Sequence, residues 1–141
     1  MTTIANIEAI AASLGLRAGE GCLTVDPEGL PEAAARLKDP DGPDFEYLDM
    51  ITAADYPQGF ELVYRFLSLK NNQYVTLKTR VPRENPAVPS ITALWKAADF
   101  QEREIYDLFG ITFTGHPCLR RIMLWEGFQG HPLRKDYQRG D

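Results

Sequence analysis

The amino-acid sequence predicts an α+β fold, in which helices pack on one side of a mostly antiparallel mixed sheet and an extended C-terminal segment follows. Three features predict it: two helical segments near the N-terminus, two segments with a period of two and a third strand candidate after them, and no usable periodicity from residue 129 onward. The chain of 141 residues is long enough for one core, and its 44% apolar and 25% charged residues are typical of globular proteins. We therefore expect one domain over residues 1–141, with residues 115–141 as a C-terminal strip.

The first third of the chain predicts two helices and a short strand. Apolar residues recur at three- and four-residue spacings over residues 3–14, and Gly15 is a typical stop. Residues 22–25 are a strand candidate. An alanine-rich second helix is expected over residues 30–37, with Pro31 tolerated in its first turn.

The middle of the chain predicts a series of strands. Residues 45–52 and 60–67 alternate with a period of two, and residues 74–81 form a third strand candidate. The pair at 71–72 is Asn-Asn, which tolerates positive φ and favours a hairpin turn. Both sides of the alternating segments are fairly apolar, so we expect at least one strand to be covered on both faces.

Three prolines predict a loop over residues 82–89. Ser90 can cap a helical turn that runs as far as residue 95. Farther along, residues 111–113 and 121–125 are short strand candidates. From residue 129 onward no periodicity is usable.

A helix expected over residues 100–109, and closed by Gly110, contains three adjacent charges, Glu102, Arg103 and Glu104. Consecutive helical residues lie about 100° apart around the axis, so the three side chains cannot share one solvent face. At least one is expected to point inward. A buried charge needs a partner, either in the chain or in another subunit.

Two interpretations of the inward charge remain open. Asp99 and Glu102 have the spacing of a capping box, in which Glu102 reaches back to the start of the helix. Alternatively, Glu102 or Glu104 binds a guanidinium from the C-terminal strip and fixes the strip to the body. The candidate guanidinium groups are those of Arg120, Arg121 and Arg134.

A further ion pair is expected on the same helix. Arg103 and Asp107 are four residues apart, and such a pair contributes a few tenths of a kcal/mol when exposed.

His116 and His131 each precede a proline, which favours extended geometry at a turn. Neither has a nearby cluster of Asp, Glu or Cys residues, so we interpret both as turn and interface residues and expect no metal site. Cys22 and Cys118 lie far apart and are expected to be reduced thiols of a cytosolic protein.

The charge distribution and the lack of other motifs exclude several function classes. Residues 1–115 contain 10 Lys/Arg against 17 Asp/Glu, whereas residues 116–141 contain 5 against 3. A small basic end on an acidic body disfavours nucleic-acid binding and favours contact with an acidic protein surface. No apolar run reaches the length of a membrane span, so we expect membrane association only through partners.

Catalysis by the chain alone is also disfavoured. No glycine-rich phosphate loop and no nucleophile motif occurs in the sequence. An acid–base enzyme using Glu102, Glu104 and Asp107 near His116 is the alternative, but the two glutamates diverge on a helix. No residue is therefore predicted to be catalytic or to bind a cofactor.

Two motifs in the second half resemble a known family. Glu102-Arg103-Glu104, Asp107-Leu108-Phe109, His116, Arg120 and Ile122-Met123 have the spacing of the diagnostic motif of the 30-kilodalton subunit of respiratory complex I, known in bacteria as the C subunit. The segment Gly-His-Pro-Leu-Arg-Lys-Asp-Tyr, which contains His131, Arg134, Lys135, Asp136 and Tyr137, resembles the end of that family's domain.

The resemblance implies a cofactor-free subunit of the peripheral arm of a proton-translocating NADH:quinone oxidoreductase. Such a subunit packs against the 49-kilodalton subunit near the quinone-reducing module, on the cytoplasmic face of the membrane or on the matrix side in a mitochondrion. FMN and iron–sulfur clusters belong to partner subunits. Homologous subunits occur in membrane-bound hydrogenases, formate hydrogenlyase and other related dehydrogenases, which remain an alternative.

Overall fold

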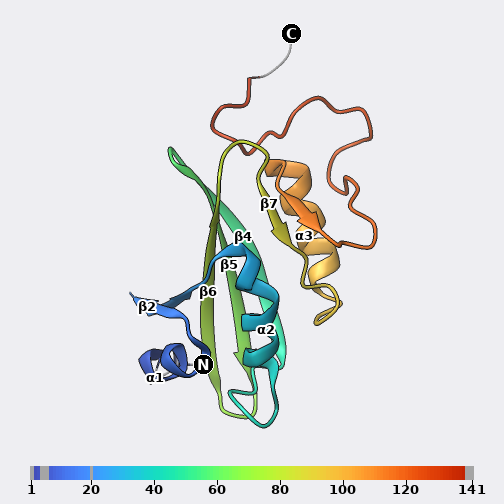
Figure 1. Cartoon of the computed structure of the whole chain (residues 1–141). Helices are drawn as coiled ribbons and strands as arrows, with labels where there is room; N and C mark the ends of the chain where they lie inside the picture. Colours follow the sequence, from blue (N-terminus) through green and yellow to red (C-terminus); the bar gives the residue numbers. More distant parts are fainter. Residues whose placement is uncertain (1, 4–6, 20, 139–141) are drawn as a thin grey trace.

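The computed structural model describes residues 2–3, 7–19 and 21–138 of the chain and confirms the α+β class (Figure 1). In chain order its elements are β1 Thr2–Thr3, α1 Ile7–Leu14, β2 Arg17–Gly19, β3 Cys22–Thr24, the 3-10 helix η1 Pro27–Gly29, α2 Leu30–Lys38, β4 Tyr47–Tyr56, β5 Gly59–Ser68, β6 Gln73–Val81, β7 Ala87–Pro89, α3 Ala98–Phe109 and β8 Thr112–Thr114.

The main sheet is mixed and has the strand order β2-β3-β6-β5-β4, with β1 also paired to β6. The long strands β4, β5 and β6 are antiparallel neighbours, whereas β1 and β3 run parallel to β6. A register shift between Leu48 and Met50 interrupts the β4–β5 pairing. A separate two-stranded parallel sheet joins β7 to β8.

One part of the core lies between the sheet and α2, which covers one sheet face, and the core continues into β7, α3 and β8 (Figure 1). The inward side of α2 is apolar and buried, with Leu30, Ala34 and Leu37 fully enclosed. Alternate residues of β5, from Phe60 to Phe66, are buried on the same side. Helix α3 lies against the edge strand β4.

A side-chain contact protects that edge strand. The Gln101 Oε1 atom of α3 accepts a hydrogen bond from the Ile51 N–H of β4 at 2.6 Å. An edge strand otherwise presents unpaired backbone groups to other chains. The contact therefore fixes α3 in register with the sheet.

Most of the predicted elements are confirmed. The strand predicted at 22–25, the helix at 30–37 and the strands at 60–67 and 74–81 agree with β3, α2, β5 and β6 to within about a residue at each end. The hairpin turn contains Asn72 at φ +53°. The helix at 100–109 and the strand at 111–113 are also present, as α3 and β8, whereas β2 and β7 were not predicted.

Some boundaries differ from the sequence-based prediction. The first helix begins at Ile7, because Thr3 lies in β1 and the predicted positions 4–6 fall outside the described residues. The strand predicted at 45–52 begins at Tyr47 and continues to Tyr56. We expected at least one strand to be covered on both faces. The outward side chains of β5, such as Val63 and Leu67, are only half-buried, so β5 is fully covered on one face alone.

The prediction of a strand at residues 121–125 is wrong. These residues form a series of bends. The N–H groups of Ile122, Met123 and Leu124 all point to one oxygen of Asp107, whereas successive N–H groups of a strand point in opposite directions. A single buried carboxylate therefore determines the local conformation.

Candidate interaction site

The site is built on the C-terminal end of α3. The helix ends at Gly110, which has φ +77° and donates its N–H to the Tyr106 carbonyl at 2.9 Å. The last carbonyls of a helix have no partner within it, and the last turn of α3 contains no basic residue of its own. Donors for these carbonyls must come from elsewhere in the chain.

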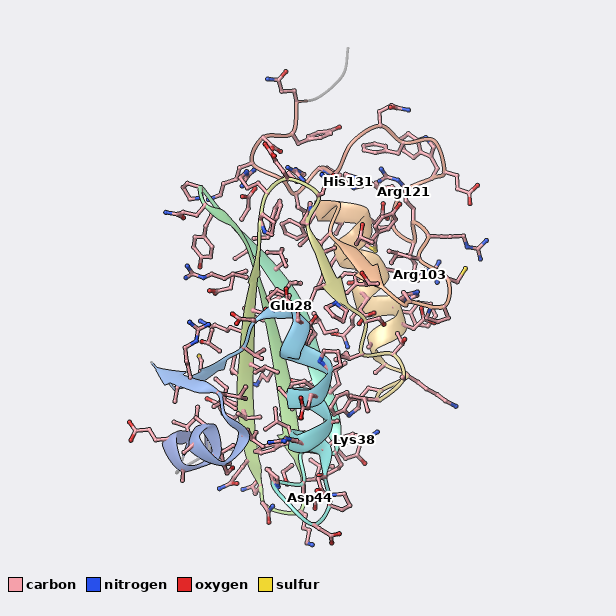
Figure 2. All side chains as sticks on the ribbon, in the orientation of Figure 1. Glu28, Lys38, Asp44, Arg103, Arg121 and His131 are labelled. Atoms are coloured by element: carbon pink, nitrogen blue, oxygen red, sulfur yellow. The ribbon has the colours of Figure 1, made fainter. Side chains whose placement is uncertain are left out.

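The C-terminal strip supplies these donors. Three of its groups reach three successive helix carbonyls: His131 Nδ1 to Asp107 O at 2.8 Å, Leu133 N to Leu108 O at 2.9 Å, and Arg134 Nη1 to Phe109 O at 3.4 Å. Because a carbonyl can only accept, His131 must carry a proton on Nδ1. Figure 2 shows His131 and Arg121 together at this end of α3.

Asp107 is the central residue of the site. Its fully buried carboxylate accepts hydrogen bonds from Arg121 Nη1 at 2.7 Å and from three backbone N–H groups, at 3.2, 2.7 and 2.9 Å. Burial alone would raise the pKa of Asp107, but the N–H groups of Leu124 and Met123, together with Arg121, hold that pKa below its usual value. Asp107 is therefore charged and attaches the strip to the helix.

The expectation of an ion pair between Arg103 and Asp107 is wrong. The strip covers this part of α3 and buries Asp107, so its carboxylate meets Arg121 instead. Arg103 donates to two strip carbonyls, through Nε to Arg120 O at 3.1 Å and through Nη2 to Arg121 O at 3.5 Å.

Glu102 is the charge of the triplet that points inward, and it is fully buried. Its carboxylate accepts the Ser90 hydroxyl at 2.6 Å and the Ile91 N–H at 2.9 Å. Burial raises the pKa of Glu102, and the bonds from Ser90 and Ile91 oppose the rise without cancelling it.

Both interpretations proposed for Glu102 are therefore wrong. Helix α3 begins at Ala98, after an N-cap residue, Ala97, that makes no side-chain cap bond. Glu102 instead caps the preceding turn, which Ser90 also caps as predicted, through its hydroxyl and the Thr92 N–H at 3.1 Å. No guanidinium pairs with Glu102, and the exposed Glu104 forms no ion pair within the described part of the chain.

A second buried carboxylate, Asp55 of β4, holds the end of the strip. It accepts the Lys135 N–H at 2.7 Å and pairs with the guanidinium of Arg83. Arg83 also binds Asp136 at 3.1 Å, and Arg134 binds Asp136 at 2.8 Å. The bond from Arg83 keeps the pKa of Asp55 low, and the bonds from Arg134 and Arg83 do the same for the pKa of Asp136.

Sequence reasoning missed Asp55 and Arg83. The available signal was the inward position of Asp55, which shares a sheet face with the apolar residues Ile51 and Ala53. A carboxylate at a core position of a strand indicates a buried partner.

The predicted histidines and glycines occupy defined positions. The His116 side chain is buried and lies 3.0 Å from Asp99 Oδ1, while its Nδ1 accepts the Cys118 N–H at 2.9 Å. A Cβ at Gly110 would lie 2.7 Å from the His131 ring. A Cβ at Gly130, which has φ +89°, would lie 2.8 Å from the Tyr137 ring, so both glycines permit close packing of the strip.

The structure thus brings half of the twelve predicted site residues to two attachment points. Asp107, Arg121, His131 and Arg134 meet at the end of α3. Lys135 and Asp136 lie at the second attachment, around Asp55 and Arg83. Arg120 and Glu104 remain exposed.

The described residues offer neither a metal site nor a membrane span. Over residues 2–3, 7–19 and 21–138, no group of three or more His, Cys, Asp or Glu side chains could hold a metal ion. None of the helices described is both long and apolar enough to cross a bilayer.

Comparison with known proteins decides the family. Residues 23–141 match the model of the respiratory-chain NADH dehydrogenase 30 Kd subunit. The chain belongs to this family. The C subunit of NADH-quinone oxidoreductase from Roseiflexus sp. (strain RS-1) is 43% identical over 136 residues, which cover 94% of this chain and 78% of that protein. The mitochondrial 30.4 kDa subunit of NADH-ubiquinone oxidoreductase from Neurospora crassa is 47% identical over 116 residues, covering 80% and 41%.

Two solved structures have a similar fold. The trypsin-resistant fragment of Nqo5 is 33% identical, with a TM-score of 0.67 over 80% of this chain and 96% of that chain. A chain of the archaeal membrane-bound sulfane sulfur reductase superposes with a TM-score of 0.75 over 94% of this chain and 83% of that one. At 23% identity, the second likeness shows the fold alone.

Proposed function

We propose that this chain is a structural subunit in the peripheral arm of a proton-translocating NADH:quinone oxidoreductase and carries no redox cofactor. In this proposal it packs against the 49-kilodalton subunit near the quinone-reducing module. The observation that carries the proposal is the C-terminal strip, which Asp107, Arg121 and His131 hold across the end of α3 in a chain of this family.

The bonding of the motif supports a structural role. Glu102 and Asp107 direct their carboxylates to donors of the same chain, and Arg121 is bound on both sides by Asp107 and the Gly130 carbonyl. Because these charged groups are already bound within the chain, they fix the conformation of the surface that the strip forms. The strip also presents large apolar side chains to the outside, among them Trp125 and Leu133, and such side chains are typical of protein interfaces.

The proposal also includes the location and the cofactors of the complex. The chain would lie on the cytoplasmic face of the membrane, or on the matrix side in a mitochondrion, and would reach the membrane through its partners. FMN and iron–sulfur clusters would reside in neighbouring subunits. The names of the relatives, which are subunits of NADH-quinone or NADH-ubiquinone oxidoreductase, support membership of such a complex, and the location and cofactors are what the family resemblance implies.

Affinity purification tests the proposal. The full chain, tagged at its N-terminus, is expressed in its native host and recovered from detergent-solubilised membranes. We expect the 49-kilodalton subunit and a flavin-bearing NADH-oxidising module to co-purify. A partner with nickel-ligating cysteines in place of that module would assign the chain to a hydrogenase-type complex and contradict the proposal.

A matched pair of variants tests the role of the strip. Asp107→Asn removes the charge that holds the strip, and we expect recovery of the 49-kilodalton subunit to fall strongly. Asp26→Asn removes the same charge from an exposed surface pair with Arg17 and should leave recovery unchanged. Equal recovery with both variants would contradict a role for the strip in assembly.

A further inference from the structure

The arginines of this chain fall into two groups. Of the nine that the structure describes, seven pair with a carboxylate of the same chain: Arg17 with Asp26, Arg36 with Glu32, Arg65 with Asp49, Arg80 with Glu61, Arg83 with Asp55, Arg121 with Asp107 and Arg134 with Asp136. Arg103 and Arg120 pair with no carboxylate among the described residues. The chain has an excess of carboxylates, with a net charge of −5, so two described guanidinium groups without a carboxylate partner differ from the general pattern.

These two arginines belong to one surface. The Arg103 guanidinium binds the backbone carbonyls of Arg120 and Arg121, so it holds the backbone of the second arginine against α3. It also lies 5.6 Å from the centre of the Phe100 ring. The Arg120 side chain is exposed. Figure 2 shows Arg103 on the outer side of α3, on the flank that faces the strip.

Exposed apolar side chains accompany the two cations. Phe100 is 58% exposed, Met123 61% and Trp125 69%. Met123 and Trp125 lie within five residues of Arg120, and the backbone between them is fixed because Asp107 binds the N–H groups of residues 122–124. Trp125 packs edge-on against Phe128 with ring centres 4.9 Å apart. The apolar side chains are therefore presented in a defined arrangement.

We propose that Phe100, Arg103, Arg120, Met123 and Trp125 form a docking surface, the arginine–tryptophan surface, for an acidic and apolar surface of a neighbouring subunit. At least one partner carboxylate would bind the Arg120 guanidinium, and a partner pocket would receive the Trp125 ring. The inference rests on the proposed function to the extent that a neighbouring subunit exists, and it adds the chemistry by which that neighbour is recognised.

Physical chemistry supports this choice of partner. A guanidinium presents several donors in a planar fork that matches a carboxylate, and such a bond is stronger than one between neutral groups. Trp and Arg are enriched among the residues that dominate interface energies, particularly where apolar contacts surround them. Arg120, which has no carboxylate partner among the described residues, lies five residues before the exposed Trp125, and exposed cations followed by exposed aromatic side chains are expected to bind a protein partner with acidic groups.

Zero-length crosslinking tests the proposal in the intact complex. A carbodiimide condenses an amine with a carboxylate, forming an amide and releasing water, which converts the carbodiimide to a urea. In the complex purified with the Arg120→Lys variant, we expect position 120 to be joined to an Asp or Glu of one neighbouring subunit. Lys70, exposed at the β5–β6 turn, serves as the internal control and should not be joined to that subunit. Links from position 120 only to its own chain, or no link, would overturn the proposal.

Matched substitutions give a second readout. Arg120→Glu and Trp125→Ala should each lower recovery of the neighbouring subunit at least tenfold in purifications at moderate salt, while the thermal midpoint of the isolated chain stays at the wild-type value. Lys70→Glu is a matching charge reversal and Leu69→Ala a matching truncation of an apolar side chain, both at exposed positions of the β5–β6 turn. Neither should change the recovery. Wild-type recovery with Arg120→Glu and Trp125→Ala would overturn the surface.

The two hypotheses fail in distinguishable ways. If the wild-type chain recovers no subunit of an NADH:quinone oxidoreductase, the proposed function fails. If it recovers them and the arginine–tryptophan surface variants recover them equally well, the docking surface alone fails.

Discussion

At the scale of single residues, two buried carboxylates of α3 have different hydrogen-bond partners and therefore opposite pKa shifts. Asp107 remains charged because it has a guanidinium and three N–H donors, whereas Glu102 has only a hydroxyl and one N–H. The pKa of Asp107 is accordingly lowered and the pKa of Glu102 is raised. Adjacent turns of one helix thus contain one carboxyl group whose surroundings stabilise its charged form and another whose burial destabilises its charged form.

Replacing the charged carboxylate should be costly. Asp107→Asn leaves Arg121 without its charged partner and replaces an acceptor oxygen by an NH₂ group that faces donors. We expect the free energy of unfolding to fall by about 3 kcal/mol, as is usual when one member of a buried ion pair is removed. Urea denaturation measures the change. An effect no larger than that of Asp26→Asn would contradict the role given to Asp107.

The raised pKa of Glu102 predicts a dependence of stability on pH. The folded state binds the Glu102 proton more tightly than the unfolded state, so stability falls as the pH rises from about 4.3, the ordinary glutamate pKa, through the folded pKa. His116, Asp99 and Tyr64 are the titratable groups that interact with Glu102.

Glu102→Gln should remove this pH dependence. The amide oxygen can still accept the Ile91 N–H, and the amide NH₂ can donate to the Ser90 hydroxyl oxygen. The difference in unfolding free energy between variant and wild type should therefore grow in favour of the variant as the pH rises through this window. Glu104→Gln, at an exposed site, provides the control. A difference that stays constant with pH would contradict the prediction.

At the scale of elements, the end of α3 and the C-terminal strip form one unit. Gly110 ends the helix in the left-handed conformation, and donors of the strip bind the carbonyls of residues 107–109. The two guanidinium groups near these carbonyls, from Arg121 and Arg134, also complement the negative end of the helix dipole. The strip thus replaces the basic residues that the last turn of α3 lacks.

Two glycine substitutions separate backbone conformation from packing. Gly110→Ala introduces a Cβ at φ +77° that would lie 2.7 Å from the His131 ring, whereas Gly115→Ala introduces one at φ +84° into open space. Both should lose roughly 1–2 kcal/mol through the left-handed conformation. Gly110→Ala should lose roughly a further 1–3 kcal/mol because the strip must shift. Thermal denaturation compares them, and equal losses would contradict the close packing of His131 on the helix end.

At the scale of the whole molecule, the sequence predicted the parts that depend on periodicity. The alternation in residues 60–67 and 74–81 identified the central hairpin, and Gly110 identified the end of α3. It did not predict β7 and β8 as a pair, because each has only three residues and proline-rich chain surrounds β7. The inward direction of one charge in the triplet followed from helical geometry alone.

The order of the C-terminal strip was the main feature beyond the reach of the sequence. No periodicity is usable from residue 129 onward, and Leu133 and Tyr137 offer little apolar surface for a core of the strip's own. Its main bonds instead join the N–H groups of Met123 and Lys135 to Asp107 and Asp55, carboxylates that lie 16 and 80 residues earlier in the chain. No residue pattern specifies which backbone N–H meets which carboxylate.

Hydrogen–deuterium exchange on the isolated chain tests most directly the claim that the strip is folded before any partner binds. The Met123, Leu124 and Leu133 amides are bound to Asp107 and to the Leu108 carbonyl, so we expect them to exchange far more slowly than unstructured amides. Asp107→Asn should accelerate exchange of the first two. Exchange of all three in the wild-type chain at the rate of an unstructured peptide, with protection only in the assembled complex, would contradict the account.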